Sequence, residues 1–431
     1  MEKRQRLGKV FREQGIIFYS VAKWIVLSAA VGCLVGLAAA VFLKALEWSL
    51  GLSELNRYYF LLLPAALFLS ALMIKLLAPD AEGHGTEKVI EAIHRNESII
   101  RAAVVPVKLV ATVITIACGG SAGKEGPCAQ IGAGVASSFA RLLRFSAADR
   151  RKMVICGISA GFASVFGTPV AGAIFALEVL VVGNLLYDVL LPSFIASVVS
   201  YNIVARLGVE YFRCEIAAPG ALSPALFGQL IPAGIFFGLC SLLLIEVMET
   251  GRKVSEKLKV WRPAKGFAGG AVLIAVALVL STDYLGLGVK SIEASLKGEA
   301  LPWYAFIMKS FATSVTLNFG GSGGVVTPIF FVGSSAGNAF GQLLGLDVAF
   351  FSAMGFVGLL AGAANTPIAA SIMAVEMFGV QTAPYAAIVC AISFFMAGHR
   401  SIYPSQIQAF RKAELAEVDT GRETGKINGG D

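Results

Sequence analysis

The chain has 431 residues, of which 56% are hydrophobic and only 15% are charged. Soluble domains usually contain about 25% charged residues, so this composition excludes an ordinary water-soluble enzyme or binding module. The net charge of +7 does not indicate nucleic-acid binding, because the basic residues lie in short hydrophilic segments between long apolar runs.

Apolar runs of membrane-spanning length recur along the chain. A helix needs about 20 consecutive apolar residues to cross the hydrocarbon of a bilayer. Uncharged runs that approach or reach this length lie at residues 24–43, 58–74, 222–245, 327–346 and 379–398. Further runs each hold one ionisable residue: Lys108, Glu125, Glu178 or Glu376. The 47 glycines fit close packing of interrupted helices. We therefore predict an all-α membrane protein.

The basic segments predict which side of the membrane the loops face. Lysines and arginines gather at residues 3–12, 141–152, 252–265 and 400–412. Since cytoplasmic loops carry an excess of such residues, we expect both termini in the cytoplasm of a cell or inner membrane. The segment 283–300 is less basic and is expected outside. A basic leader before a spanning first run argues against a cleavable signal peptide.

Internal similarity predicts two related halves. Residues 119–127 (GGSAGKEGP) and 320–328 (GGSGGVVTP) share five of nine positions at an offset of 201 (320 minus 119). Residues 168–178 match 366–376 at a nearby offset of 198 (366 minus 168). A weaker pair is 83–85 with 286–288. Duplicated halves with interrupted apolar segments at matching places indicate inverted repeats around a transport site.

These repeats define the expected organisation of the chain. We expect a cytoplasmic N-terminal segment at 1–19, a first membrane repeat at 20–206, a second at 207–410, and a loose polar cytoplasmic tail at 411–431. No soluble regulatory domain is expected. The seven cysteines lack metal-ligand spacing and are interpreted as small buried hydrophobes.

The glycine-rich motifs predict an anion site. Proline is favoured in the first turn of a helix, so helices should begin near Pro127 and near Pro328, inside the apolar region. The first N–H groups of a helix lack intrahelical partners and carry partial positive charge, which favours an anion. Glu125 lies at the edge of this site. Its carboxylate is itself an anion, so it is expected to occupy the site, to leave on protonation, and thus to gate it.

The remaining ionisable residues of the apolar runs can be interpreted as structural or as functional. Glu178 and Glu376 form a symmetric pair that caps or braces the fold, and Glu178 is also a candidate for the proton pathway together with Glu125. Lys108 either tunes the potential of the pore or makes a structural contact.

Taken together, these motifs resemble those of the CLC chloride channels and proton-coupled anion transporters, over roughly residues 20–410. The GREGP motif of that family corresponds to residues 123–127, with Lys124 in place of Arg. The GxFxP motif corresponds to residues 324–328, with valine in place of Phe, and GSGIP corresponds poorly to residues 83–87. The tyrosine that follows the last membrane helix corresponds to Tyr403.

The resemblance implies a homodimer in the lipid bilayer with one pore in each subunit, and chloride as the transported ion with no other cofactor or metal. It implies that Glu125 is the gate. The implied anion-binding residues are His84, Gly85, Lys124, Glu125, Gly126, Val325, Val326 and Tyr403.

Two departures from the family pattern leave the mode of transport open. His84 stands where the family has Ser in chloride-selective members and Pro in nitrate-preferring ones, so selectivity is not fixed. Val179 replaces the internal proton glutamate of coupled exchangers, which favours a passive channel gated by Glu125. The alternatives are a proton-coupled antiporter with a non-standard internal route, or a fluoride- or nitrate-preferring member. Tyr403 argues against the fluoride branch, which usually lacks it.

Other classes of protein are less well supported by the sequence. Residues 119–123 match the G-x-S-x-G motif of serine hydrolases, but the motif recurs at 320–324 and an enzyme needs one nucleophile. An intramembrane serine hydrolase is therefore a remote alternative, and the protein is expected not to be an enzyme. A cation or solute carrier would need acidic rings or polar pockets in the membrane.

Overall fold

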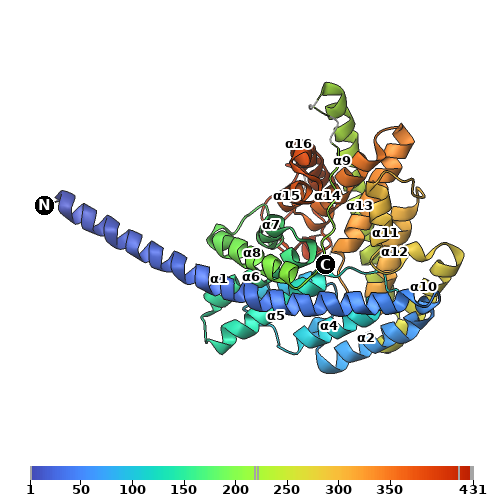
Figure 1. Ribbon diagram of the computed structural model, residues 1–431, viewed down its shortest axis with the longest axis horizontal. Helices are drawn as coiled ribbons and strands as arrows, with labels where there is room; N and C mark the ends of the chain where they lie inside the picture. The colour runs from blue at the N-terminus through green and yellow to red at the C-terminus, as the bar shows by residue number, and fades with distance from the viewer. Residues whose placement is uncertain (1, 218–219, 221–222, 416–417, 428–431) are drawn as a thin grey trace.

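The computed structural model describes residues 2–217, 220, 223–415 and 418–427. Over these residues the fold is almost entirely helical (Figure 1). The helices of the first half are α1 (Glu2–Glu54), α2 (Leu63–Leu77), α3 (Thr86–Arg95), α4 (Val104–Ala117), α5 (Glu125–Leu142), α6 (Ala147–Phe166), α7 (Pro169–Glu178) and α8 (Leu190–Arg206). The expected all-α fold is confirmed.

The second half repeats this order of long and short helices. Its helices are α9 (Pro224–Lys257), α10 (Arg262–Val279), α11 (Val289–Leu296), α12 (Ala305–Asn318), α13 (Val326–Leu344), α14 (Val348–Ala364), α15 (Pro367–Phe378) and α16 (Ala383–Met396), followed by the short α17 (Thr424–Ile427). The 3₁₀ turns are η1 (Tyr59–Leu62), η2 (Pro79–Ala81), η3 (Tyr187–Val189), η4 (Thr282–Tyr284) and η5 (Val380–Thr382). Two short strands, β1 (Val181–Val182) and β2 (Ile407–Gln408), pair in parallel.

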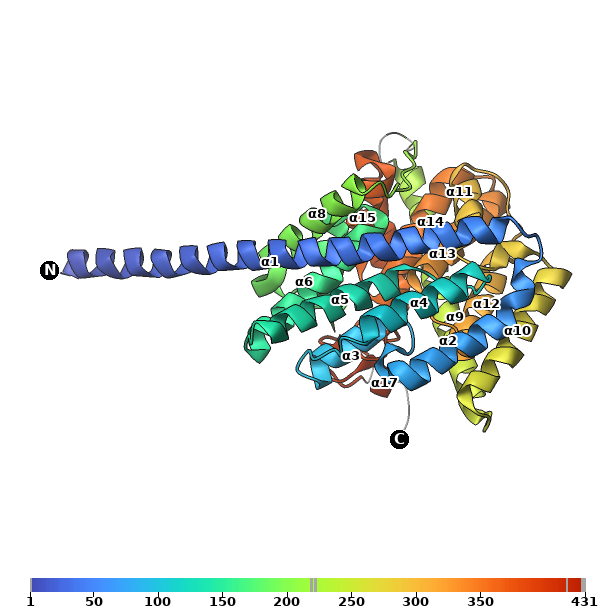
Figure 2. The ribbon, with the colours of Figure 1, turned by 60° about the horizontal axis from the view of Figure 1, so that its bottom comes forward.

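Helices of membrane-spanning length are accompanied by shorter ones. Five segments are long and apolar enough to cross a bilayer, within α1, the η1–α2 unit, the η3–α8 unit, α9 and α10. Helices such as α4, α7, α14 and α15 are apolar but shorter. The α1 helix projects beyond the helical body at its N-terminal end and runs across it further on (Figures 1 and 2).

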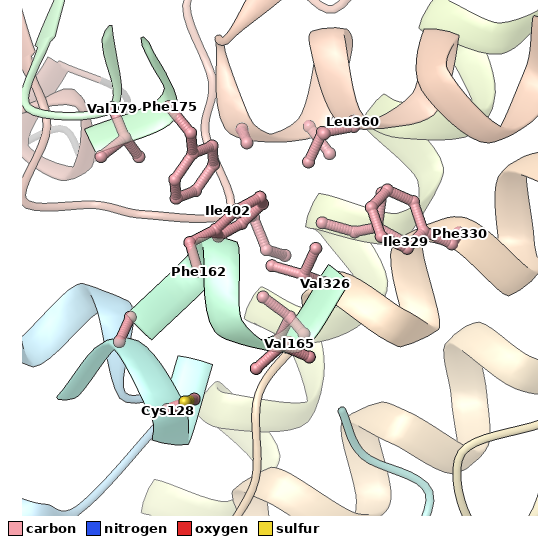
Figure 3. Packing of buried hydrophobic residues seen from close by; sticks show 14 of the residues in the cluster. Cys128, Phe162, Val165, Phe175, Val179, Val326, Ile329, Phe330, Leu360 and Ile402 are labelled. Atoms are coloured by element: carbon pink, nitrogen blue, oxygen red, sulfur yellow. The ribbon is translucent and has the colours of Figure 1, made fainter. Parts of the chain in front are cut away.

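The centre of the molecule is built from the first and second helices after each glycine motif. The pair α5 and α6 packs together in the first half, and α13 and α14 pack in the same way in the second. The two pairs meet in a shared apolar core. Figure 3 shows Phe162 and Val165 of α6 beside Val326 and Ile329 of α13, with Leu360 of α14 nearby. This core holds the starts of α5 and α13 deep inside the protein.

The described part of the C-terminal tail is docked, so the expectation of a loose tail from residue 411 was wrong there. The backbone N–H of Gln408 donates to the carbonyl of Arg422 at 2.9 Å, and Thr424 donates to the carbonyl of Gln406 at 2.8 Å. The carboxylate of Glu423 also pairs with Arg95 of α3. Polar composition alone does not reveal such contacts, because the partners lie far away in the sequence.

Candidate anion site at the meeting of the two halves

The two glycine motifs pair directly with each other. The N–H of Gly123 donates to the carbonyl of Gly324 at 2.7 Å, and the N–H of Gly324 donates back to Gly123 at 2.7 Å. A side chain at position 324 would meet the backbone nitrogen of Gly126 at 2.7 Å, so the close approach requires glycine. This antiparallel bridge is what a two-fold relation between the halves produces.

A second set of reciprocal contacts holds each glycine loop to the opposite half. The hydroxyl of Thr316 accepts from the N–H of Ser121 at 2.9 Å. In the same way the hydroxyl of Thr115 accepts from the N–H of Ser322 at 3.0 Å. The hydroxyls of these serines each bind one more threonine: Ser121 binds Thr313 and Ser322 binds Thr112, both at 3.0 Å. The loops are thereby fixed before α5 and α13 begin.

Both helices then start inside the protein, where their first N–H groups lack intrahelical partners. The Glu125 carboxylate lies at the start of α13. It accepts a hydrogen bond from the N–H of Thr327 at 3.0 Å and from the Thr327 hydroxyl at 2.6 Å. Val325 and Val326 are buried at the same helix start. The anionic side chain of one half thus occupies the positive helix end of the other.

The loop before α3 forms a further wall of this site. Gly85 has a φ of +78° and contacts the backbone of Gly126 so closely that any Cβ would collide with it. The loop is anchored by Lys108, whose Nζ donates to the carbonyls of Ala81 at 3.1 Å and Gly83 at 2.7 Å. His84 follows directly, and its Nδ1 is buried without a hydrogen-bond partner.

Tyr403 brings a fourth segment to the site. Its side chain is fully buried, and its hydroxyl makes no close hydrogen bond, although the Thr86 side chain interacts with it. The hydroxyl lies within electrostatic reach of Glu125. Its backbone is held by the Ser401 hydroxyl, which accepts from the N–H of Tyr403 at 3.0 Å and donates to Gln406 at 2.5 Å. An unpartnered buried donor next to a helix start is suited to an anion.

The predicted site residues therefore lie together. His84, Gly85, Glu125, Gly126, Val325, Val326 and Tyr403 come from four separate segments that meet at the starts of α5 and α13. Lys124 differs from the buried residues of this set, because it is partly exposed to solvent. It lies just before α5. Within the described residues no cluster of metal-ligating side chains was found.

The sequence matches a known family over most of its length. Residues 66–398 match the family model of the voltage gated chloride channels. The chain belongs to the voltage gated chloride channel family. The resemblance to the CLC proteins is thus confirmed.

Members of this family with names and structures are clearly similar to the chain. A chloride/fluoride channel protein of Pseudomonas syringae pv. tomato is 38% identical, over 90% of this chain and 86% of its own. The H(+)/Cl(-) exchange transporter ClcA of Klebsiella pneumoniae subsp. pneumoniae is 25% identical, over 81% of this chain and 80% of its own. The crystal structure of a CLC-type fluoride/proton antiporter is 29% identical with a TM-score of 0.86, over 91% of this chain and 99% of that protein.

Within this member of the chloride channel family, Glu178 and Glu376 make reciprocal contacts. The Glu178 carboxylate, at the end of α7, accepts from the N–H groups of Ile368 at 3.0 Å and Ala369 at 2.8 Å, at the start of α15. The Glu376 carboxylate of α15 accepts from Val170 and Ala171, at the start of α7, at 3.0 and 2.8 Å. Each glutamate caps the opposite helix, which is the bracing arrangement the symmetry suggested.

Val179, which follows Glu178, is an apolar residue that packs among other apolar side chains. Val179 is fully buried, and Phe175, Phe162 and Ile402 lie between it and Val326 (Figure 3). The Val179 side chain itself carries no titratable group, and its carbonyl accepts a hydrogen bond from the side-chain amide of Gln406 at 2.8 Å.

The structure also reveals residues that the sequence analysis did not single out. Thr327 supplies both donors to Glu125. Lys309 is the symmetric counterpart of Lys108, since its Nζ donates to the carbonyls of Tyr284 at 3.2 Å and Gly286 at 2.8 Å. The repeat offset of 201 (309 minus 108) would have identified Lys309. Glu87 and Gln406 had no such signal, because their partners come from distant segments.

Proposed function

We propose that the protein transports small anions across a membrane, and that the anion and the Glu125 carboxylate compete for one site at the start of α13. The observation that carries the proposal is the pair of hydrogen bonds from Thr327 to Glu125. These donors bind a carboxylate without any lysine or arginine in contact. A halide has the same needs, and donors without full charge bind an anion while still allowing its release.

Transport then proceeds by exchange at this site. Protonation of Glu125, or arrival of an anion, releases the carboxylate from Thr327. The anion takes its place, bound by the N–H groups at the start of α13 and by the unpartnered groups of Tyr403 and His84. Lys108 fixes the loop that carries His84 through two carbonyls. No metal or organic cofactor is needed for these steps.

We interpret the serines of the glycine loops as structural rather than nucleophilic. Ser121 and Ser322 occupy equivalent positions, and each hydroxyl binds a threonine of the opposite half. A serine nucleophile needs an adjacent base to take its proton. No histidine is recorded as a partner of either serine in the described part of the chain. Transport rather than hydrolysis is therefore the function that the site supports.

Chloride and fluoride are the two candidate ions. The chloride/fluoride channel protein and the fluoride/proton antiporter are both similar to this chain. This similarity favours fluoride, whereas the presence of Tyr403 was interpreted as evidence against the fluoride branch. Fluoride is a strong hydrogen-bond acceptor, and the site offers hydroxyl donors from Thr327 and Tyr403 besides backbone N–H groups. We propose that the protein carries fluoride as well as chloride, as a homodimer in the bilayer with both termini in the cytoplasm.

Anion efflux from liposomes tests this proposal. Vesicles holding the purified protein and loaded with potassium fluoride or potassium chloride are diluted into anion-free buffer with valinomycin, and an ion-selective electrode records release. We expect protein-dependent release of both anions. Glu125→Ala should release them independently of pH, since no carboxylate remains to compete. Release of neither anion, together with a protein-dependent leak of potassium without valinomycin, would contradict the proposal.

A further inference from the structure

A second buried carboxyl lies next to the anion site. Glu87 is in the first turn of α3, and its Oε1 accepts hydrogen bonds from the N–H of Ser405 at 3.0 Å and from the Ser405 hydroxyl at 2.5 Å. Its Oε2 is shielded from solvent and has no hydrogen-bond partner. A buried carboxylate oxygen without a partner is costly, whereas a protonated carboxyl or a bound water satisfies it.

The charges around Glu87 act on it in opposite directions, because Lys88 lowers the pKa of its carboxyl and Glu91 raises it. On its own helix, Lys88 and Arg95 are both paired with Glu91, at 2.8 and 3.4 Å, and Arg95 also pairs with Glu423. From α6, Arg151 acts on His94, at the far end of α3. No ion pair is recorded for Glu87 within the described residues. Burial raises the pKa of the Glu87 carboxyl to about 7, although the Ser405 hydrogen bonds oppose this shift. The carboxyl therefore gains and loses its proton near neutral pH.

Tyr403 is near both carboxyls. Its unpartnered hydroxyl is within electrostatic reach of both Glu87 and Glu125, and it is two residues from Ser405, the partner of Glu87. Three buried groups with unmet hydrogen bonds, Glu87 Oε2, Tyr403 Oη and His84 Nδ1, are thus contributed by adjoining segments. Polar groups of this kind are where buried waters bind, and a hydroxyl with water conducts protons.

We propose that Glu87 is the proton-relay carboxyl of this protein, passing protons from the cytoplasmic side through the Tyr403 hydroxyl and intervening water to Glu125. In this step the Glu87 O–H bond breaks and Glu87 becomes a carboxylate. An O–H bond forms on Glu125, which becomes neutral and leaves Thr327. Glu87 then takes a new proton from cytoplasmic water. The inference rests on the proposed function and specifies how its site is coupled to protons.

The other candidates for this role are occupied or apolar. Both oxygens of Glu178 already accept backbone N–H groups of α15. Position 179 is a buried valine among aromatic and aliphatic side chains. Glu87 differs from Glu178, because one of its oxygens has no hydrogen-bond partner.

Proton uptake driven by an anion gradient tests the assignment. Liposomes with an outward gradient of fluoride, and separately of chloride, are prepared with wild-type protein, and both anion release and external pH are recorded. We expect uphill proton uptake by the wild type. Glu87→Gln keeps the size of the side chain and an acceptor for Ser405 but cannot relay a proton. It should slow proton uptake at least about 100-fold, while anion release stays within about twofold of wild type.

Matched variants separate a relay from a structural role. Glu91→Gln removes a carboxylate one turn further along α3 and should leave proton uptake unchanged, whereas Glu87→Asp should retain it in part. If Glu87→Gln does not fold, Glu87→Met fills the same space and carries the same expectation. Anion release by the wild type without proton uptake would overturn the relay and leave anion transport standing. Full proton uptake by Glu87→Gln, or equal loss of both fluxes, would also overturn it.

Discussion

Glu125 and Thr327, which are 202 residues apart, are joined by hydrogen bonds from both the N–H and the hydroxyl of the threonine to the carboxylate. The contact links the start of α5 in one half to the start of α13 in the other. Because the donors at a helix start suit any small anion, we propose that an anion binds where the carboxylate lies. In this proposal the gate and the binding site are one place.

The Thr327 hydroxyl is expected to hold the gate closed. In Thr327→Val, Glu125 loses a hydrogen bond to a charged group, which is worth about 1.5–3 kcal/mol, or about tenfold to a hundredfold in the gate equilibrium. Wild-type anion release should be faster at pH 4.5 than at pH 7.5, and the variant should reduce that ratio. Thr168→Val is the control, because the Thr168 hydroxyl is buried without a partner. An unchanged pH ratio in Thr327→Val would contradict the assigned contact.

Tyr403→Phe separates anion binding from stability. The hydroxyl has no partner in the closed site, so its removal should change the melting temperature of the purified protein little. The anion loses one donor, which should weaken binding by about 0.5–1.5 kcal/mol, or up to about tenfold. Isothermal titration with fluoride and chloride measures this. A large fall in melting temperature with unaltered anion affinity would show that the hydroxyl serves the fold instead.

The two buried lysines should differ in function although their contacts are equivalent. Lys108→Met and Lys309→Met each leave two carbonyls without a donor, so each should cost about 1–3 kcal/mol per lost buried partner and lower the melting temperature. Only Lys108 anchors the loop of His84, so only Lys108→Met should also weaken anion binding. Equal effects on anion binding in both variants would indicate that the positive charge of the lysine, rather than the loop that Lys108 anchors, determines anion affinity.

The symmetric glutamates are expected to be structural. Glu178→Gln and Glu376→Gln each replace one acceptor oxygen by a donor amide that faces a backbone N–H, at a cost of about 1–3 kcal/mol. Both variants should melt earlier, and the protein that remains folded should transport anions and protons at wild-type ratios. If Glu178→Gln keeps anion release but stops proton uptake, Glu178 lies on the proton pathway.

Much of this arrangement follows from the sequence, for physical reasons. Apolar runs predict the helices because the bilayer demands them, and the proline and glycine positions predict that helices begin inside the protein. The offset between the motifs predicts which residues are equivalent. For that reason Glu178 and Glu376 were paired correctly, and an anion site at the start of α13 was predicted before its contact with Glu125 was known.

The remaining features depend on contacts that local patterns do not carry. The docked tail is held by backbone hydrogen bonds between residues 406–408 and 422–424, which a polar composition does not signal. The Glu87 contact with Ser405 spans 318 residues, so a pattern within a short segment does not reveal it. From the sequence, Thr327 was interpreted only as the residue before a proline. Its hydroxyl was not considered, because backbone N–H groups alone are enough to predict an anion site.

Anion binding by wild-type protein and Glu125→Ala, measured by isothermal titration with fluoride and chloride at pH 7.5, tests the competition at the start of α13 most directly. If the carboxylate and the anion share this site, Glu125→Ala binds anions more tightly than the wild type, and lowering the pH to 4.5 brings the wild type toward the variant. Equal affinities at both pH values would contradict the account, because an anion bound elsewhere does not sense whether Glu125 is present.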